Sequence, residues 1–316
     1  MPGARAAARA SAGSRGVAAS QLTFPLVPRW RPAGSPFGRL RASRRGLGSS
    51  VAGSRPYRRG DSLAAIDWKS SARLSSVRSE PEFLVREHFA DESPRVVMVA
   101  DRRPSMGLYP EPWLSKPATL QTLWQLVSAA ALAELGLAGF LDATEWIAPS
   151  SRAGLEHVER DLVEAPFDAP EGSLDDAFDR LATVRRSLSA GTFVFVCSDF
   201  LAPPSSAWWA RAHAFRWDVV PVVIQDPVWE QSFPPIERLV VPFADPATGR
   251  THRIRLGRVE AALRRRANES RLALIVSDLR AFGLEPIVVS NSTESDVLAA
   301  LTAWGETRLA VRRGEW

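Results

Sequence analysis

The chain has 316 residues, 45% of them hydrophobic, and a formal net charge of +5 at pH 7. This composition is typical of a folded, soluble protein with a sizeable core, arranged as one large domain or two small ones. The single cysteine, Cys197, excludes an internal disulfide and a cysteine-based metal cluster, and its apolar neighbours favour inert packing. The chain has no glycine-rich phosphate-binding motif and no Gly-x-Ser-x-Gly motif, which argues against nucleotide hydrolysis and against an esterase-type nucleophile.

The basic charge is concentrated at the head of the chain. Residues 1–60 hold 12 of the 40 basic residues and none of the 35 acidic ones. Residues 1–46 are rich in Arg, Ala, Ser and Gly and lack a sustained apolar period, so we expect a disordered tail. Three further readings are an organellar transit peptide, a start codon placed too early, and a segment that binds nucleic acid or anionic lipid.

Nothing in the sequence predicts a membrane segment or a secretory signal. No apolar stretch follows the first positive charges, as a signal peptide requires. The longest apolar region, residues 127–141, is interrupted by Ser128 and Glu134 and is shorter than the roughly 18 residues that a membrane span needs. We therefore expect a cytoplasmic protein.

Residues 53–74, GSRPYRRGDSLAAIDWKSSARL, crowd charged and aromatic side chains into one turn-rich segment. Ion pairs between its acids and cations, together with an aromatic anchor, predict a structured strap held to a domain surface. The residues that form the motif are Arg55, Tyr57, Gly60, Asp61, Asp67, Trp68, Lys69 and Arg73.

From Arg95 onward, short apolar runs alternate with longer amphipathic ones, which is the pattern of a parallel sheet with helices on both faces. The continuous runs VVMVA and FVFVC favour strands buried on both sides. We predict strands at Val96–Ala100, Leu137–Leu141, Thr144–Ala148, Thr192–Cys197, Val219–Ile224 and Pro286–Val289. We predict helices at Ala118–Glu134, Leu174–Leu188, Ser206–Phe215, Arg258–Phe282 and Ser295–Thr307.

Residues 234–249 carry turn signals around the apolar run LVVPF, and they predict an extra hairpin or a long loop. The adjacent Trp208 and Trp209 open a predicted helix. Two neighbouring side chains of a helix cannot both face one core stripe. One indole is therefore expected either at the surface, where it would mark an interface, or half-buried against the loop at Pro203 and Pro204.

The strap pattern G-x-R-x-Y-x-x-G-D-x-x-x-x-I-D-W-K-x-S-A-R resembles the signature of the bacterial domain-of-unknown-function 58 family. In that family the following domain is similar to a von Willebrand factor A domain. The resemblance covers roughly residues 47–308 and implies an α/β fold, von Willebrand A-like (Rossmann-like), with a mostly parallel sheet. The expected segments are a tail at 1–46, the strap at 47–94, the α/β domain at 95–308 and a C-terminal tail at 309–316.

In an open parallel sheet, ligands bind where loops leave the carboxyl ends of the strands. Three polar segments stand at such places: Asp101 to Ser105 after the first core strand, Ser173 at the start of a helix, and Asp199 at the end of the central strand. The resemblance implies a cation site here, because von Willebrand A domains place D-x-S-x-S, a threonine and an acidic residue at these positions. The metal candidates are therefore Asp101, Ser105, Ser173 and Asp199.

Arg103 departs from that pattern, because it stands where the family has its first serine. A guanidinium beside Asp101 and Asp199 would neutralise both carboxylates and repel a second cation. We therefore expect a degenerate metal-ion-dependent adhesion-type site, with Mg²⁺ or Mn²⁺ disfavoured by Arg103. A purely structural alternative is that these aspartates hold loops and that Ser173 caps its helix in a capping box with Asp176.

The resemblance implies a non-enzymatic protein-interaction module. Its partner would be a MoxR-type AAA+ ATPase or a client of that ATPase, and its role that of an adaptor or co-factor in protein maturation. The alternative is a metal-dependent phosphoesterase or nuclease that uses Asp101 and Asp199 as ligands of Mg²⁺ or Mn²⁺. That alternative lacks an obvious general base. A role in binding nucleic acid is not favoured.

Overall fold

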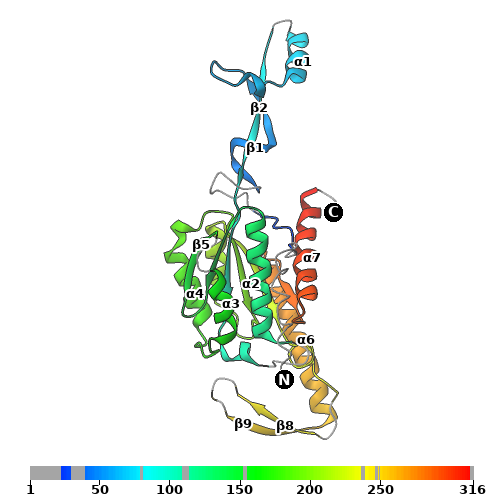
Figure 1. Cartoon of the computed structure of the whole chain (residues 1–316). Coiled ribbons are helices and arrows are strands. Elements are labelled where there is room, and N and C mark those ends of the chain that lie inside the picture. The colour runs from blue at the N-terminus through cyan, green and yellow to red at the C-terminus, as the bar shows by residue number, and fades with distance from the viewer. Residues whose placement is uncertain are drawn as a thin grey trace, which may run out of the picture.

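The computed structural model describes residues 23–29, 40–78, 81–108, 114–151, 155–235, 239–245, 248 and 250–313. At its centre lies a six-stranded sheet in the order β10-β7-β6-β3-β4-β5 (Figure 1). Five strands run parallel: β3 (Arg95–Ala100), β4 (Leu137–Leu141), β6 (Phe193–Ser198), β7 (Asp218–Ile224) and β10 (Ile287–Val289). The edge strand β5 (Trp146–Ser150) is antiparallel to β4. The predicted α/β class with a mostly parallel sheet is thus confirmed.

Helices cover both faces of this sheet. One face packs against α2 (Lys116–Ala133), α3 (Leu155–Glu164) and α7 (Glu294–Arg313). The other face packs against α4 (Ser173–Thr183), α5 (Ser206–Ala214) and α6 (Arg258–Ala281). Two hydrophobic layers therefore hold the sheet between them.

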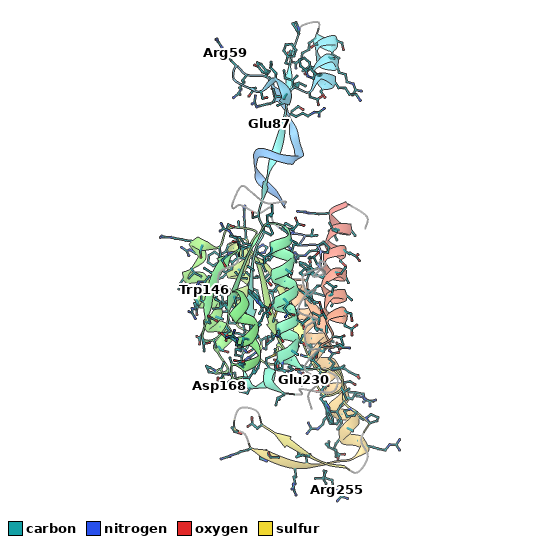
Figure 2. The ribbon with its side chains drawn as sticks, viewed as in Figure 1. Arg59, Glu87, Trp146, Asp168, Glu230 and Arg255 are labelled. Carbon is teal, nitrogen blue, oxygen red and sulfur yellow. The ribbon has the colours of Figure 1, made fainter. Side chains whose placement is uncertain are left out.

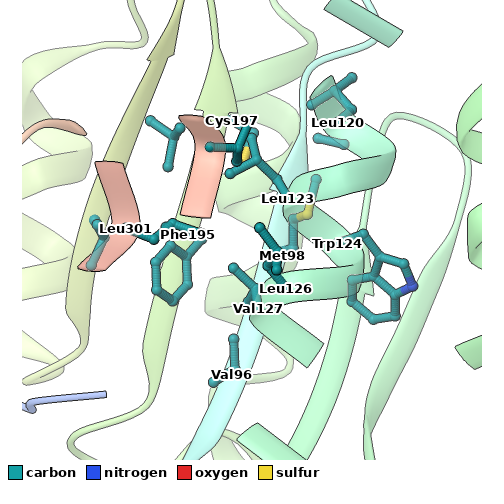
Figure 3. Close-up of a cluster of buried hydrophobic side chains, with 14 of the residues drawn as sticks. Val96, Met98, Leu120, Leu123, Trp124, Leu126, Val127, Phe195, Cys197 and Leu301 are labelled. Atoms are coloured by element: carbon teal, nitrogen blue, oxygen red, sulfur yellow. The ribbon is translucent and has the colours of Figure 1, made fainter. Parts of the chain in front are cut away.

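Successive side chains of the central strands point alternately into the two hydrophobic layers. Val96 and Met98 belong to the α2 layer, whereas Val97 and Val99 belong to the opposite one. Figure 3 shows part of the α2 layer, where Met98 lies among side chains of α2 such as Leu123 and near Phe195 of β6. A strand that is apolar on both sides has to be covered on both sides, which is why VVMVA and FVFVC occupy the middle of the sheet.

The predicted elements differ from the structure mainly at their ends. The helix expected to reach Leu188 ends at Thr183 and is followed by a 3₁₀ turn, Arg185–Ser187. The last helix is longer than expected and continues to Arg313, so the expected C-terminal tail is helical over its first part. Two helices were not predicted, α1 (Trp68–Arg78) and α3.

The strap does not lie on the surface of the domain. β1 (Leu40–Pro56) and β2 (Leu84–Glu92) pair antiparallel and form an arm that projects from the sheet at the amino ends of its strands (Figure 1). The tip of the arm consists of a 3₁₀ turn, Leu63–Ala65, and α1. The expectation of a strap held to the domain is wrong because the ion pairs of the motif are made within the arm itself.

The expected disordered tail also needs correction at residues 23–29. Phe24, Leu26 and Val27 are buried, the first two of them in the α2 layer. The Phe24 ring meets Phe195 and Trp304 edge to face, with a centroid distance of 6.2 Å in both cases. The run TFPLV is too short to show a period, yet its Phe24 packs against Trp304 of α7. Residues 40–46 belong to β1, whereas residues 1–22 and 30–39 lie outside the described residues.

The predicted extra hairpin is present but lies further along the chain. β8 (Leu239–Ala244) and β9 (Thr251–Leu256) pair antiparallel and extend beyond the carboxyl ends of the parallel strands (Figure 1). The expectation of an exposed indole is wrong, because Trp208 and Trp209 are both buried. Phe178 of α4 contacts both indoles, stacking on Trp208 at 5.3 Å and meeting Trp209 edge to face at 5.4 Å.

Candidate functional site

The candidate site lies where the order of the strands reverses. The chain passes from β3 to β4 on one side and later returns to β6 on the other side of β3. The loops after β3 and β6 therefore diverge at their carboxyl ends, which is the usual ligand position in open α/β sheets. Asp101 follows β3 directly and Asp199 follows β6, so the topology brings these two predicted residues together.

Asp101 and Arg103 form a buried ion pair. Arg103 donates from Nη2 to Asp101 Oδ2 at 2.6 Å and from Nε to both carboxylate oxygens at 3.0 Å. The backbone N–H of Arg103 also donates to Asp101 Oδ1, at 2.9 Å, which makes an Asx turn at the end of the strand. The hydroxyl of Ser198 donates to Asp101 Oδ2 at 2.7 Å. The Asp101 carboxylate is thus fully engaged by protein donors.

Arg103 also connects the two strand ends. Its Nη1 donates to the carbonyl oxygen of Ala202 at 2.6 Å, and its Nη2 lies 4.0 Å from Asp199 Oδ1. Burial opposes the charged guanidinium, but Asp101, Asp199 and Glu171 outweigh it and hold the pKa of Arg103 above its ordinary value. Arg103 therefore pairs with Asp101 and only approaches Asp199. The expectation that it neutralises both carboxylates and repels a second cation is wrong, because Lys116 binds Asp199.

A second cation, Lys116, occupies the other side of Asp199. Its side chain is fully buried, and its ammonium donates to Asp199 Oδ2 at 3.1 Å and to Glu230 Oε1 at 2.6 Å. A third bond goes to the carbonyl oxygen of Ser105 at 3.0 Å. Glu230 is held in turn by the backbone N–H of Asp226, which donates to its second oxygen at 2.8 Å. One ammonium therefore joins the loops after β3, β6 and β7.

The pKa values of the two carboxylates that share Lys116 are shifted in opposite directions. Burial tends to raise the pKa of Asp199, but the charge of Lys116 and hydrogen bonds from Ser105 and Leu201 hold that pKa below its ordinary value. Burial raises the pKa of Glu230 more than Lys116 lowers it, and the nearby Asp199 charge adds to the increase. A single ammonium cannot fully compensate two buried carboxylates, which explains the difference.

The loop after β6 is strained at the site. Phe200 is buried and has a φ of 54°, a left-handed conformation that costs a bulky residue of order 1–3 kcal/mol. Its N–H donates to the Ser198 hydroxyl at 2.9 Å, and the N–H of Leu201 donates to Asp199 Oδ1 at 3.0 Å. These bonds hold the chain in a turn that keeps the Asp199 carboxylate directed at Lys116.

Ser105 and Ser173 have different places in the structure. Ser105 contributes its carbonyl to Lys116, and its hydroxyl bonds to Asp199. Ser173 is buried at the first position of α4, and its hydroxyl has no hydrogen-bond partner among the described residues. Gly172 rather than Ser173 is the N-cap, so the capping box with Asp176 in the structural alternative is wrong.

The donor set does not fit a divalent cation. Such an ion needs several free oxygen ligands, whereas Asp101 is bound by Arg103, and Asp199 is bound by Lys116. Across the described ranges, no group of three or more His, Cys, Asp or Glu side chains is placed to hold a metal ion. A metal ion would have to displace Arg103 from Asp101 or Lys116 from Asp199.

Sequence reasoning missed Lys116 and Glu230. Lys116 is one of only two lysines in the chain and stands between the N-cap Ser115 and Pro117, a position that reads as an exposed helix start. Glu230 follows a turn built on Asp226, whose Oδ1 accepts from the N–H groups of Val228 and Trp229, both at 2.8 Å. Lys116 and Glu230 meet only because the loops after β3, β6 and β7 converge at the start of α2.

The strap motif lies at the other end of the molecule. Arg55 donates to both oxygens of Asp61, at 2.6 and 2.7 Å, and to Glu87 at 3.1 Å. The bonds from Arg55 to Asp61, together with one from the N–H of Arg58, lower the pKa of Asp61 to about 2. Asp67 caps α1 through Ser70 and pairs with Arg86 at 3.0 Å.

The remaining motif residues face solvent. Trp68 is 61% exposed and meets Phe83 edge to face, with centroids 5.9 Å apart. Tyr57, Lys69 and Arg73 are exposed as well, and Gly60 supplies a φ of 105° in the turn. Figure 2 shows the separation, with Arg59 and Glu87 on the arm and Asp168 and Glu230 at the far end of the sheet. The motif therefore takes no part in the strand-end site.

Fold and site together define a class: an α/β protein whose strand ends at the switch point are joined by buried internal ion pairs. The chain belongs to the family described as Protein of unknown function DUF58, whose model matches residues 53–299. No curated protein matches it. Among the described residues, none of the helices combines the length and the apolar character that crossing a bilayer requires.

Two solved structures are similar to this chain. One is the conserved hypothetical protein BatB from Bacteroides thetaiotaomicron, with a TM-score of 0.39 and 14% identity, covering 67% of this chain and 99% of that one. The other is an aerotolerance-related membrane protein from Bacteroides fragilis NCTC 9343 with multiple mutations to serines. Its TM-score is 0.40 and its identity 15%, over 68% of this chain and 99% of that one.

Proposed function

We propose that the protein is a non-enzymatic protein-interaction module that recognises its partner with the carboxyl-end face of the sheet. The observation that carries the proposal is the set of buried ion pairs Asp101–Arg103 and Asp199–Lys116–Glu230. Charges that are fully committed to one another hold loops in one shape, as a recognition surface requires, but leave no free nucleophile or base for catalysis.

The α/β domain is proposed to be von Willebrand A-like, with a degenerate adhesion-type site. In relatives of adhesion type, a bound cation accepts a carboxylate of the partner. Here Arg103, Ser105 and Ser173 would stand near the corresponding position. The partner that the family resemblance suggests is a MoxR-type AAA+ ATPase or its client. An adaptor of such an ATPase in protein maturation would act in the cytoplasm, where ATP is available.

The alternative is a metal-dependent phosphoesterase or nuclease. It would need Asp101 and Asp199 as metal ligands, and each of them is bound by a protein cation. Assays with a panel of phosphate esters and nucleic acids in the presence of Mn²⁺ test it directly. Turnover that is lost in Asp199→Ala would favour the enzyme over the interaction module.

A pull-down from lysate of the native host tests the interaction module. Native protein and Asp199→Ala, each checked for its fold by circular dichroism, are compared with and without ATP. The expected result is an AAA+ protein that is captured in an ATP-dependent manner by the native chain alone. Identical captures by both proteins would contradict the use of the strand-end face.

A further inference from the structure

Lys116 makes the contacts of a coordinated cation. Its side chain is fully buried, and each of its three ammonium hydrogens has an oxygen acceptor, at 2.6, 3.0 and 3.1 Å. The acceptors are two carboxylates and one backbone carbonyl, and they come from the loops after β7, β6 and β3. Hard oxygen ligands gathered from separate loops are the ligands that proteins use for Mg²⁺, Mn²⁺ and Ca²⁺.

We propose that the Lys116 ammonium is a built-in substitute for a divalent cation, and that removing it turns the surrounding oxygens into a divalent-cation site. The ammonium is attached to the chain, so it holds the three loops together whatever the concentration of metal. If the strand-end face is the recognition surface proposed above, on which this point rests, its contact with the partner needs no divalent cation bound at the strand ends.

Arg103 cannot play the same part. Its guanidinium binds Asp101 through two nitrogens and lies 4.0 Å from the nearer oxygen of Asp199, so it neutralises a different carboxylate. Removing Arg103 leaves Lys116 bound to Asp199 and Glu230. Only the loss of Lys116 frees two carboxylate oxygens and the carbonyl of Ser105 together. Lys116 is thus the residue that separates this chain from a metal-binding one.

The test uses thermal unfolding of the full chain in metal-free buffer and in MnCl₂. Lys116→Ala should unfold at a lower temperature than the native chain, and Mn²⁺ at about 100 times its Kd should raise its Tm by roughly 5 °C or more, because the ion binds the folded state alone. A titration should give one ion per chain. The native protein and Lys69→Ala, which removes the only other lysine, should show no such shift.

Two further variants identify the site. Lys116→Met fills the space of the lysine stem without a charge, so it should be destabilised like Lys116→Ala but should not respond to Mn²⁺. Adding Asp199→Asn to Lys116→Ala should abolish the response. A native protein that binds Mn²⁺ as tightly as Lys116→Ala, or a folded Lys116→Ala that binds none, would overturn the proposal.

If Lys116→Ala does not fold alone, refolding decides the matter. Mn²⁺ in the refolding buffer should restore the native circular dichroism of Lys116→Ala and leave Lys116→Met unfolded. Failure to rescue Lys116→Ala with Mn²⁺, Mg²⁺ or Ca²⁺ would sink the proposal. The unfolding and refolding measurements test the built-in cation without any partner, so their failure is distinct from that of the proposed function. The absence of any partner in the pull-down contradicts only the interaction module.

Discussion

At the scale of residues, the site consists of buried charged side chains that form ion pairs with one another. A buried pair is a weak source of net stability, but breaking it by removing one partner leaves an uncompensated charge and is strongly destabilising. Asp101, Asp199 and Lys116 are all essentially inaccessible to solvent. Each is therefore sensitive to the loss of its neighbour, and substitutions can test this directly.

Arg103→Met should lower the free energy of unfolding by about 3–5 kcal/mol, because it leaves the Asp101 carboxylate buried with Ser198 as its remaining side-chain donor. Urea denaturation measures the change. Arg58→Met, at an exposed position of the arm, is the matched control and should change stability by less than about 0.5 kcal/mol. Equal effects of the two variants would show that Arg103 is not a buried ion-pair partner.

The dependence of stability on pH should reveal the shared ammonium. Asp199 has a lowered pKa, so its contribution is present above the ordinary value of 3.8 and is lost as the pH falls through the folded-state pKa. Glu230 has a raised pKa, so its contribution is present below the ordinary value of 4.5 and is lost as the pH rises through the folded-state pKa.

Asp199→Asn should therefore flatten the acid side of the stability profile, and Glu230→Gln should flatten the decline above pH 4.5. Urea denaturation of the three proteins at a series of pH values measures both effects. Profiles of the same shape for all three would contradict the assigned directions of the pKa shifts.

At the scale of elements, Arg308 of α7 ties together parts of the chain that are far apart in sequence. It donates to both oxygens of Asp218 at the start of β7, at 2.8 and 2.9 Å, and to the carbonyl oxygen of Val27 at 2.9 Å. It also pairs with Glu285 and lies over the ring of Trp304 at 4.3 Å. This cluster explains why residues 23–29 are held against the domain.

Arg308→Met should destabilise the domain by about 3–5 kcal/mol, because Asp218 would remain buried without its cation. It should also release residues 23–29, which limited proteolysis can detect as faster cleavage near Val27. Arg312→Met, which loses a bond to the carbonyl oxygen of Pro28 near the surface, is the control and should have a much smaller effect. Unchanged stability of Arg308→Met would contradict this role.

The arm should respond to its own ion pairs independently of the sheet. Asp61→Asn removes the acceptor of Arg55, so amide hydrogen exchange should accelerate around Arg58 and stay unchanged in β6. In the native protein the same amides should lose protection, measured relative to the intrinsic exchange rate at each pH, as the pH falls from the ordinary 3.8 through about 2, where Asp61 becomes protonated. Glu82→Gln, which breaks a more exposed pair with Arg78, should leave the exchange unchanged.

Most elements of the domain could be predicted from sequence because their signals are local. The strands around Val97 and Val194 are continuous apolar runs, and α2 and α6 are long. The arm was missed as an arm because pairing between β1 and β2 depends on residues about 30 to 50 positions apart in the chain. Its charged motif indicated a structured segment but not where that segment lies.

At the scale of the whole molecule, the structure has two ends with different chemistry. The arm presents Trp68 and Phe83 together with the exposed cations Lys69 and Arg73, whereas the opposite end carries the buried ion pairs and the β8–β9 hairpin (Figure 2). The site was predictable in part. Strand ends identify Asp101, Arg103 and Asp199, but no local pattern marks Lys116 or Glu230, which meet them only through the packing of α2 and the loop after β7.

We propose that the carboxyl-end face, not the arm, meets the partner. A photo-crosslinking amino acid placed at Glu171, an exposed residue whose charge acts on Arg103, tests it without disturbing the buried pairs. The same group at Val77, 81% exposed on α1, probes the arm. In lysate of the native host, the account predicts an ATP-dependent adduct with an AAA+ protein at position 171 and none at position 77. An adduct that forms only at position 77 would contradict it.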